Sequence, residues 1–180
     1  TRQKRGSLRP NARELGTRGT PELRLQEAKA AAGIMGLTIR ENMGFRDGFF
    51  QDDEPHQMAL LTKIRQYQPE IILANAVEDR HPDHGKGAAL ARSAVFLSGL
   101  RKIETQVDGR QQEAWRPKAL YHFIQSIYLE PDFVVDVSRY WERKIEAIRA
   151  YESQFHNPKS DEPETYISRP QFMQMIEGRG

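Results

Sequence analysis

The apolar residues of this chain follow two patterns in turn: helical spacing in some segments and short unbroken runs in others. Unbroken apolar runs are typical of strands buried on both faces of a parallel sheet. In chain order we expect a helix from Thr20 to Gly36, a strand over Ile39–Met43, a helix from Glu54 to Pro69, a strand over Ile71–Ala74, a helix from about Gly85 to Leu97, strands over Ala119–Ile124 and Phe133–Val137, a helix capped by Ser138, and a helical segment over Gln171–Ile176. Because strands and helices alternate, the pattern predicts an α/β fold with a Rossmann-like, mostly parallel sheet and flanking helices.

Composition narrows the class of protein. The chain has 180 residues, of which 38% are hydrophobic and 29% charged, and it has no cysteine. A disulfide framework and a thiolate metal site are therefore excluded, so any metal must be held by His, Asp, Glu or water. No apolar run approaches the roughly 20 residues of a membrane helix. These features exclude a membrane partner and favour a cytoplasmic location.

Charge is unevenly distributed along the chain. The net charge is +2, but residues 1–13 hold five basic residues and no acidic one. One interpretation is a nucleic-acid-binding arm. The simpler one, which we favour, is a basic tail over residues 1–13 that is disordered or non-native, followed by the domain at residues 14–180. No aromatic residue interleaves these charges, so we expect no nucleic-acid partner.

The segment between the run at Ile71–Ala74 and the next helix is unusually rich in ionisable groups. It reads Asp79-Arg80-His81-Pro82-Asp83-His84. In open α/β sheets ligands bind where a strand gives way to a helix. Histidines three residues apart at the start of a helix lie on one side of it, where imidazole nitrogens and a carboxylate could bind a divalent metal. The alternative is that His84 caps the helix and Asp83 interacts with the helix dipole.

These residues carry a resemblance to a known family. His81-Pro82-Asp83-His84, preceded by Asp79-Arg80, resembles the second signature of the LmbE-like (PIG-L) zinc-dependent deacetylases. Further similar segments are Glu14–Thr20, Arg24–Ala28, Arg46–Gly48 and Tyr151–Phe155, and the resemblance covers about residues 13–178. The combination is most similar to the branch that deacetylates N-acetylglucosaminyl-malate in bacillithiol synthesis.

The resemblance implies a role for each site residue. His84 would ligate Zn²⁺ or another divalent metal, and His81 would donate a proton or stabilise an oxyanion beside it. Asp83 would orient a histidine. The residues implied in binding the substrate, a small-molecule N-acetylglucosamine conjugate, are Arg24, Asp47, Arg80 and Arg116. The resemblance also implies a homo-oligomer.

Simpler interpretations exist for three of these residues. Arg24 could be an exposed helix residue, and Asp47 could be a turn former beside a glycine. Arg116 precedes Pro117 in a polar segment, and there we favour the interpretation without a substrate role.

The chain departs from the family pattern in one respect. The other family signature, Ala-His-Pro-Asp-Asp, would supply the remaining two metal ligands and the general base, and it does not occur in these 180 residues. We therefore expect a partial LmbE-like deacetylase domain, truncated at both ends. The alternative function is a catalytically inactive, deacetylase-like protein that binds sugars or supports assembly.

Overall fold

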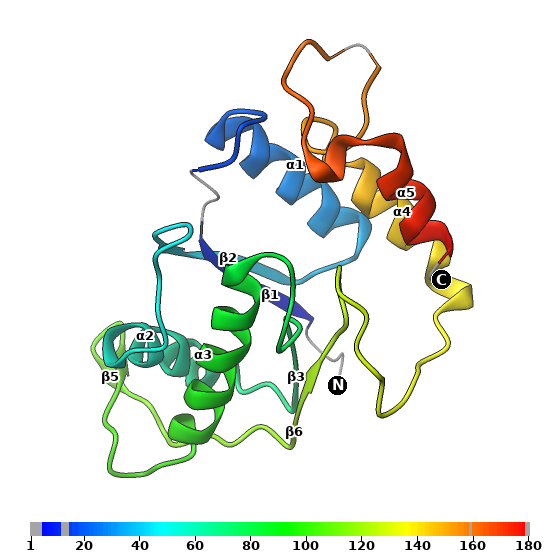
Figure 1. Ribbon diagram of the computed structural model, residues 1–180. Coiled ribbons are helices and arrows are strands. Elements are labelled where there is room, and N and C mark those ends of the chain that lie inside the picture. The colour runs from blue at the N-terminus through cyan, green and yellow to red at the C-terminus, as the bar shows by residue number, and fades with distance from the viewer. Residues whose placement is uncertain (1–4, 12–14, 159, 179–180) are drawn as a thin grey trace. The chain divides into compact units, whose positions relative to one another are not determined.

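A computed structural model describes residues 5–11, 15–158 and 160–178 (Figure 1). Glu14, residues 1–4 and 12–13 of the basic segment, and Lys159 lie outside the described part. The elements in chain order are β1 (Gly6–Asn11), α1 (Pro21–Ile34), β2 (Ile39–Phe45), α2 (Glu54–Tyr67), β3 (Ile71–Ala74), α3 (Pro82–Ser98), β4 (Gln106–Val107), β5 (Arg110–Gln111), β6 (Ala119–His122), a 3-10 turn (Ser138–Tyr140), α4 (Trp141–Arg149), a second 3-10 turn (Tyr166–Ser168) and α5 (Pro170–Gly178). No helix of the described residues is both long and apolar enough to span a membrane.

The chain divides into two compact units. One comprises residues 1–42 and 133–180, and the other comprises residues 43–132. This division differs from the expected one, in which a tail over residues 1–13 preceded a single domain. Part of that tail, Gly6–Asn11, forms strand β1 and pairs with β2. The disorder expected for these residues is therefore wrong, because pairing with β2 satisfies backbone groups that a free tail would leave to water.

The unit of residues 43–132 contains the parallel strand pair. Strand β3 pairs with β6 in parallel, with Ile71 opposite Ala119 and Ala74 opposite His122. Helix α3 packs on both strands and α2 packs on α3, as Figure 1 shows in green and cyan. Leu61, Ile64 and Ala94 form the buried centre of this packing. The expected fold class, an α/β protein with a parallel sheet and flanking helices, is confirmed.

The unit of residues 1–42 and 133–180 is built around α1 and α4, which pack on each other. Thr20 caps α1 as expected, because its side chain accepts a 3.2 Å hydrogen bond from the backbone N–H of Leu23. The buried face of α1 includes Ala28 and Ala31, and that of α4 includes Ile145 and Ala147. Small residues on the α1 face allow the two helices to approach closely.

Two expected features of the second half are wrong. Phe133–Val137 forms no strand, and Val134 is 85% exposed. Strand propensity needs a partner ladder to take effect, and no strand of the described residues pairs with this segment. Ser138 does not cap a helix, because its N–H and hydroxyl both donate to Asp136 Oδ1, at 2.9 and 2.6 Å, and α4 begins only at Trp141.

The segment 104–116 contains the β4–β5 hairpin. Its turn residues Asp108 and Gly109 have φ values of +51° and +73°. Positive φ at both central residues is what a two-residue hairpin turn requires, and Asp-Gly is a preferred sequence for it. The hairpin therefore had a sequence signal.

Candidate active site

The candidate site lies at the carboxyl ends of the parallel strands β3 and β6. The chain leaves β3 at Ala74 and enters α3 at Pro82, with His81 as the N-cap residue. Proline suits the first helical position because its missing N–H would have no partner there, so α3 begins three residues earlier than Gly85. The segment after β6 lies beside this loop, since Asn75 Nδ2 donates to Gln125 Oε1 at 3.1 Å.

Asp79 is the buried anchor of the loop. Its side chain is fully buried, and its Oδ1 accepts hydrogen bonds from the backbone N–H groups of Ser126 at 2.8 Å and Ile127 at 3.0 Å. Its Oδ2 pairs with His84 Nδ1. Burial alone would raise the pKa of Asp79, but the hydrogen bonds from His84 and from backbone N–H groups outweigh burial and lower the pKa to about 2. The group is therefore a carboxylate at neutral pH.

The Asp79 carboxylate determines the tautomer of His84. A carboxylate only accepts hydrogen bonds, so Nδ1 of His84 must carry the proton in this pair. A neutral ring then has its free lone pair on Nε2. Carboxylate–histidine pairs of this kind orient imidazoles that bind metals and increase their basicity. His84 is half-buried, and Nε2 is the ring atom through which it could bind a metal.

His81 has the opposite arrangement. Its Nδ1 accepts a hydrogen bond from the backbone N–H of Asp83 at 3.2 Å. A neutral ring that accepts at Nδ1 carries its proton on Nε2, where it can be donated. The two rings are close, with centroids 5.2 Å apart and planes at 31°. The hydrogen bonds therefore give the two rings different properties. His84 can offer a lone pair, whereas His81 can donate a hydrogen bond.

The Asp83 carboxylate contacts a neighbouring loop, and the role expected for Asp83 in orienting a histidine stays a prediction. The carboxylate that orients His84 belongs to Asp79, whereas Asp83 Oδ2 accepts a 2.8 Å hydrogen bond from the backbone N–H of Gly48. Asp83 Oδ1 lies 3.7 Å from Lys86 Nζ. Asp83 lies in the first turn of α3, where its carboxylate reaches the neighbouring loop rather than back along the chain. It contributes to the orientation of His81 through its backbone N–H.

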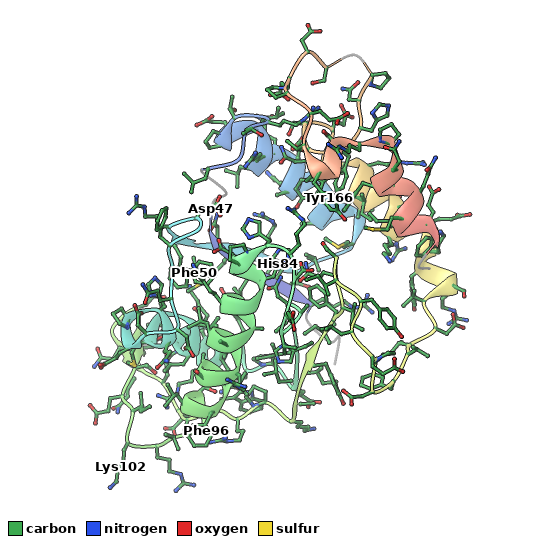
Figure 2. The ribbon with its side chains drawn as sticks, in the orientation of Figure 1. Asp47, Phe50, His84, Phe96, Lys102 and Tyr166 are labelled. Carbon is green, nitrogen blue, oxygen red and sulfur yellow. The ribbon has the colours of Figure 1, made fainter. Side chains whose placement is uncertain are left out.

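The structure brings Asp47 to this end of α3. Asp47 is buried and directly precedes Gly48, whose backbone contacts Asp83. Figure 2 shows Asp47 and His84 at the same end of the helix. Arg80 is exposed and directly precedes His81. The substrate-binding roles of Asp47 and Arg80 stay predictions, and both residues are placed where they could serve them.

Arg116 does not belong to this site. Its Nη2 donates to the carbonyl of Phe96 at 2.9 Å, and its guanidinium lies 5.0 Å from the centre of the Phe96 ring. Phe96 is in the last turn of α3, whereas His84 is in the first. At a rise of about 1.5 Å per residue, these ends lie roughly 18 Å apart. This placement supports the interpretation that we favoured for Arg116, in which the residue has no substrate role, because it binds the carboxyl end of the helix.

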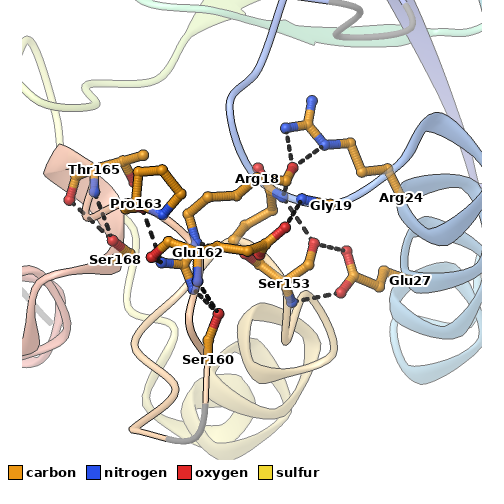
Figure 3. Close-up of polar contacts among 11 residues, drawn as sticks. Arg18, Gly19, Arg24, Glu27, Ser153, Ser160, Glu162, Pro163, Thr165 and Ser168 are labelled. Atoms are coloured by element: carbon orange, nitrogen blue, oxygen red, sulfur yellow. Dashed lines mark hydrogen bonds and ion pairs between the residues drawn. The ribbon is translucent and has the colours of Figure 1, made fainter.

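Arg24 lies in the other unit, within a buried polar network (Figure 3). Its Nε donates to the carbonyl of Arg18 at 2.9 Å, and Gln154 Nε2 donates to the same carbonyl at 2.9 Å. The Arg18 guanidinium donates to the carbonyls of Ser153 at 2.8 Å and Pro163 at 3.1 Å. Arg24 is therefore a buried helix residue rather than an exposed one, and its substrate role stays a prediction.

The described residues do not complete a metal centre. Among residues 5–11, 15–158 and 160–178, no three His, Asp or Glu side chains are grouped so that they could hold a metal ion. A catalytic zinc site normally has three protein ligands. His84 suits one of those positions, so the donor set fits part of such a site and not all of it.

Sequence reasoning placed both histidines at the start of a helix but missed the contacts that Asp79 makes with His84 and Lys86 with Gly48. Both carboxylates of the Asp79–His84 segment could have oriented His84. The choice depends on backbone N–H groups 47 and 48 residues further along the chain. No local signal distinguishes the two carboxylates, because the parallel register of β3 and β6 brings those N–H groups to Asp79.

We expect Asp79→Asn to weaken metal binding by about 10–100-fold, which is the usual effect of removing such a partner. An amide can donate to His84 Nδ1, and the ring then carries its proton on Nε2, where it blocks a metal. Titration with Zn²⁺ or Co²⁺ measures the affinity, and the ¹⁵N shifts of the His84 ring report the tautomer directly. An unchanged His84 tautomer in the variant would contradict the assignment. Asp136→Asn is the matched control, since Asp136 is exposed and contacts Ser138.

Comparison with known proteins identifies the family of the chain. The model of the family "PIG-L: GlcNAc-PI de-N-acetylase" matches residues 3–95. Diacetylchitobiose deacetylase of Thermococcus kodakarensis is 28% identical over 137 residues, covering 73% of this chain and 49% of that protein. The 4-oxalmesaconate hydratase of Pseudomonas putida is 27% identical over 139 residues, covering 75% of this chain and 52% of that protein.

A solved structure is also similar, that of a conserved protein from Thermus thermophilus. It is 35% identical, with a TM-score of 0.78 over 84% of this chain and 67% of that one. The match over residues 3–95 and the similar fold show that the chain belongs to the PIG-L family. The chain spans about half the length of the curated relatives it matches.

Proposed function

We propose that the protein hydrolyses the N-acetyl group of a glucosamine conjugate. The observation that carries this proposal is the histidine pair at the carboxyl edge of the parallel strands, in which Asp79 and the Asp83 backbone favour opposite tautomers for His84 and His81. Metal-assisted amide hydrolysis uses both an imidazole lone pair that binds the metal and a nearby hydrogen-bond donor. A deacetylase among the relatives supports this reaction class.

His81 has the central role among the described residues. Its Nε2–H can donate a hydrogen bond to the oxygen of the tetrahedral intermediate. For the Nε2 proton to pass to the amine nitrogen as the C–N bond breaks, His81 must first take up a second proton on Nδ1, so that a neutral imidazole remains after the transfer. Asp47, held at the same end of α3, is suited to accept hydrogen bonds from sugar hydroxyls. Arg80, exposed beside His81, is suited to an anionic group of the substrate.

We propose Zn²⁺ as the metal and His84 as one of its ligands. A zinc ion bound there would polarise the amide carbonyl and lower the pKa of a bound water. The described residues contribute His84 to that site and do not complete it.

The proposed substrate is N-acetylglucosaminyl-malate, as in bacillithiol synthesis. The support is the similarity of Glu14–Thr20, Arg24–Ala28 and Tyr151–Phe155 to that branch of the family. A malate group would bring two carboxylates, which match the exposed cation of Arg80.

The test is acetate release in the presence of Zn²⁺ from three compounds: N-acetylglucosaminyl-malate, diacetylchitobiose and free N-acetylglucosamine. We expect release to be fastest from the malate conjugate and to stop when a chelator is added. His156→Gln is the matched control, because His156 is an exposed histidine of the other unit and should leave the rate unchanged. Absence of acetate release from all three compounds would overturn the proposal.

The second candidate is a sugar-binding protein without catalysis. It is favoured by the lack of a three-ligand group among the described residues. It predicts measurable affinity for N-acetylglucosamine conjugates, no acetate release at any Zn²⁺ concentration, and no change in affinity when Zn²⁺ is removed.

A further inference from the structure

Gly48, in the loop that carries Asp47, is bound to α3 through both of its backbone polar groups. The backbone N–H of Gly48 donates to Asp83 Oδ2 at 2.8 Å, and the backbone carbonyl of Gly48 accepts a 2.8 Å hydrogen bond from Lys86 Nζ. Asp83 and Lys86 are one helical turn apart and lie 3.7 Å from each other. The N–H and the carbonyl of Gly48 are thus bound by Asp83 and Lys86, which form an ion pair on α3.

The conformation of this loop depends on glycine and on aromatic packing. Gly44 and Gly48 have φ values of +69° and +76°, which other residues adopt only with strain. Beyond Gly48, Phe50 is 1% exposed, and its ring centre lies 6.1 Å from that of Phe45. The aromatic residues hold the two ends of the loop, and the contacts at Gly48 hold its tip.

Charge makes these contacts stronger than ordinary loop hydrogen bonds. Hydrogen bonds in which one partner is ionised are roughly twice as strong as neutral ones. The Asp83 side chain is 6% exposed, so Lys86 also serves as the counter-ion of a buried carboxylate. Removing the ammonium group therefore weakens both contacts to Gly48 together.

We propose that Lys86 is a positioning residue that acts through Asp47. With Asp83 it holds Gly48, and it thereby directs the Asp47 carboxylate toward the sugar hydroxyls of the substrate. Lys86 itself does not touch the substrate, and it determines how well sugars bind rather than how fast the amide is cleaved. This inference rests on the proposed function for its substrate and on the contacts at Gly48 for its mechanism.

The first test needs no activity. Amide hydrogen exchange of the peptide covering residues 44–50 is measured in wild type, Lys86→Met, Lys86→Arg and Lys63→Met. Met keeps the length of the side chain and removes its charge, and Lys63 is the control because it is a partly buried lysine of α2 that donates to Gln66. We expect about tenfold faster exchange in Lys86→Met alone, with Lys86→Arg close to wild type. Unchanged exchange in Lys86→Met would overturn the inference, whatever the activity.

The second test separates binding from chemistry. We expect Lys86→Met to raise KM for the N-acetylglucosamine conjugate about tenfold and to leave kcat within about threefold, as the loss of one oriented charged hydrogen bond predicts. In an Asp47→Asn background, Lys86→Met should have little further effect, because the two residues act in series. A fully additive double variant would contradict the role through Asp47.

The two tests also separate this inference from the proposed function. Suppose that wild type neither binds nor hydrolyses the sugar, but residues 44–50 still exchange faster in Lys86→Met. The proposed function then fails, and the contacts at Gly48 have a structural role only. This result would overturn the substrate role of Lys86. If wild type is active and the KM of Lys86→Met is unchanged, the inference fails and the proposed function survives.

Discussion

The His81→Gln variant is expected to release acetate about 10²–10⁴-fold more slowly than wild type, the usual contribution of a general acid. Glutamine is close to histidine in size and can still hydrogen-bond the backbone N–H of Asp83, so the fold is retained. It cannot pass a proton to the leaving amine. Acetate release at saturating substrate measures the effect.

Metal binding provides the contrast that identifies the two roles. His81→Gln should bind Zn²⁺ with nearly wild-type affinity, whereas His84→Gln should lose both affinity and activity. Equal loss of zinc affinity in the two variants would mean that both rings are ligands, and the division of roles between them would be wrong. His156→Gln serves again as the control.

The Arg65→Met variant is expected to lose stability by about 3 kcal/mol or more, because several carbonyl groups lose a charged donor. Arg65 is 3% exposed. Its guanidinium donates to the carbonyls of Ser98 at 3.0 Å, Leu100 at 2.8 Å and Ile103 at 2.6 Å, and to Thr105 Oγ1 at 3.0 Å. These acceptors lie at and beyond the carboxyl end of α3, which the arginine joins to α2.

Urea unfolding of the intact protein measures this loss. Arg65→Lys should recover only part of the stability, since an ammonium group cannot reach the acceptors that the planar guanidinium spans. Arg101→Met is the matched control, because Arg101 is exposed and lies in the same segment, and it should change stability by no more than about 0.5 kcal/mol. An equal loss in the two methionine variants would contradict the role of Arg65.

Sequence reasoning succeeded for elements whose signals are local. Thr20 and Pro21 begin α1, and the apolar run Ile71–Ala74 is strand β3 with those same bounds. It failed at Phe133–Val137, where the residues favour a strand but no strand of the described chain pairs with them. A strand depends on a partner ladder, and its own residues do not show whether that ladder exists.

For the candidate site, too, the local features could be predicted and the features that depend on distant residues could not. The spacing of His81 and His84 was sufficient to place both rings on one side of a helix start, because helical geometry is a local property. The sequence did not show which carboxylate pairs with His84, since the backbone N–H groups of Ser126 and Ile127 bind Asp79 and bury it beside the ring. The contact of Arg116 with the carboxyl end of α3 is likewise a tertiary feature.

The amino-acid sequence by itself determined where α1 and α2 begin, which runs form β3 and β6, and which two histidines lie together at the start of a helix. Only the tertiary structure decided which carboxylate orients His84, which side chains hold the loop of Asp47, and what Arg65 and Arg116 bind. The physical reason is distance along the chain: caps and periodicity act within a few residues, whereas these polar contacts join groups that are tens of residues apart.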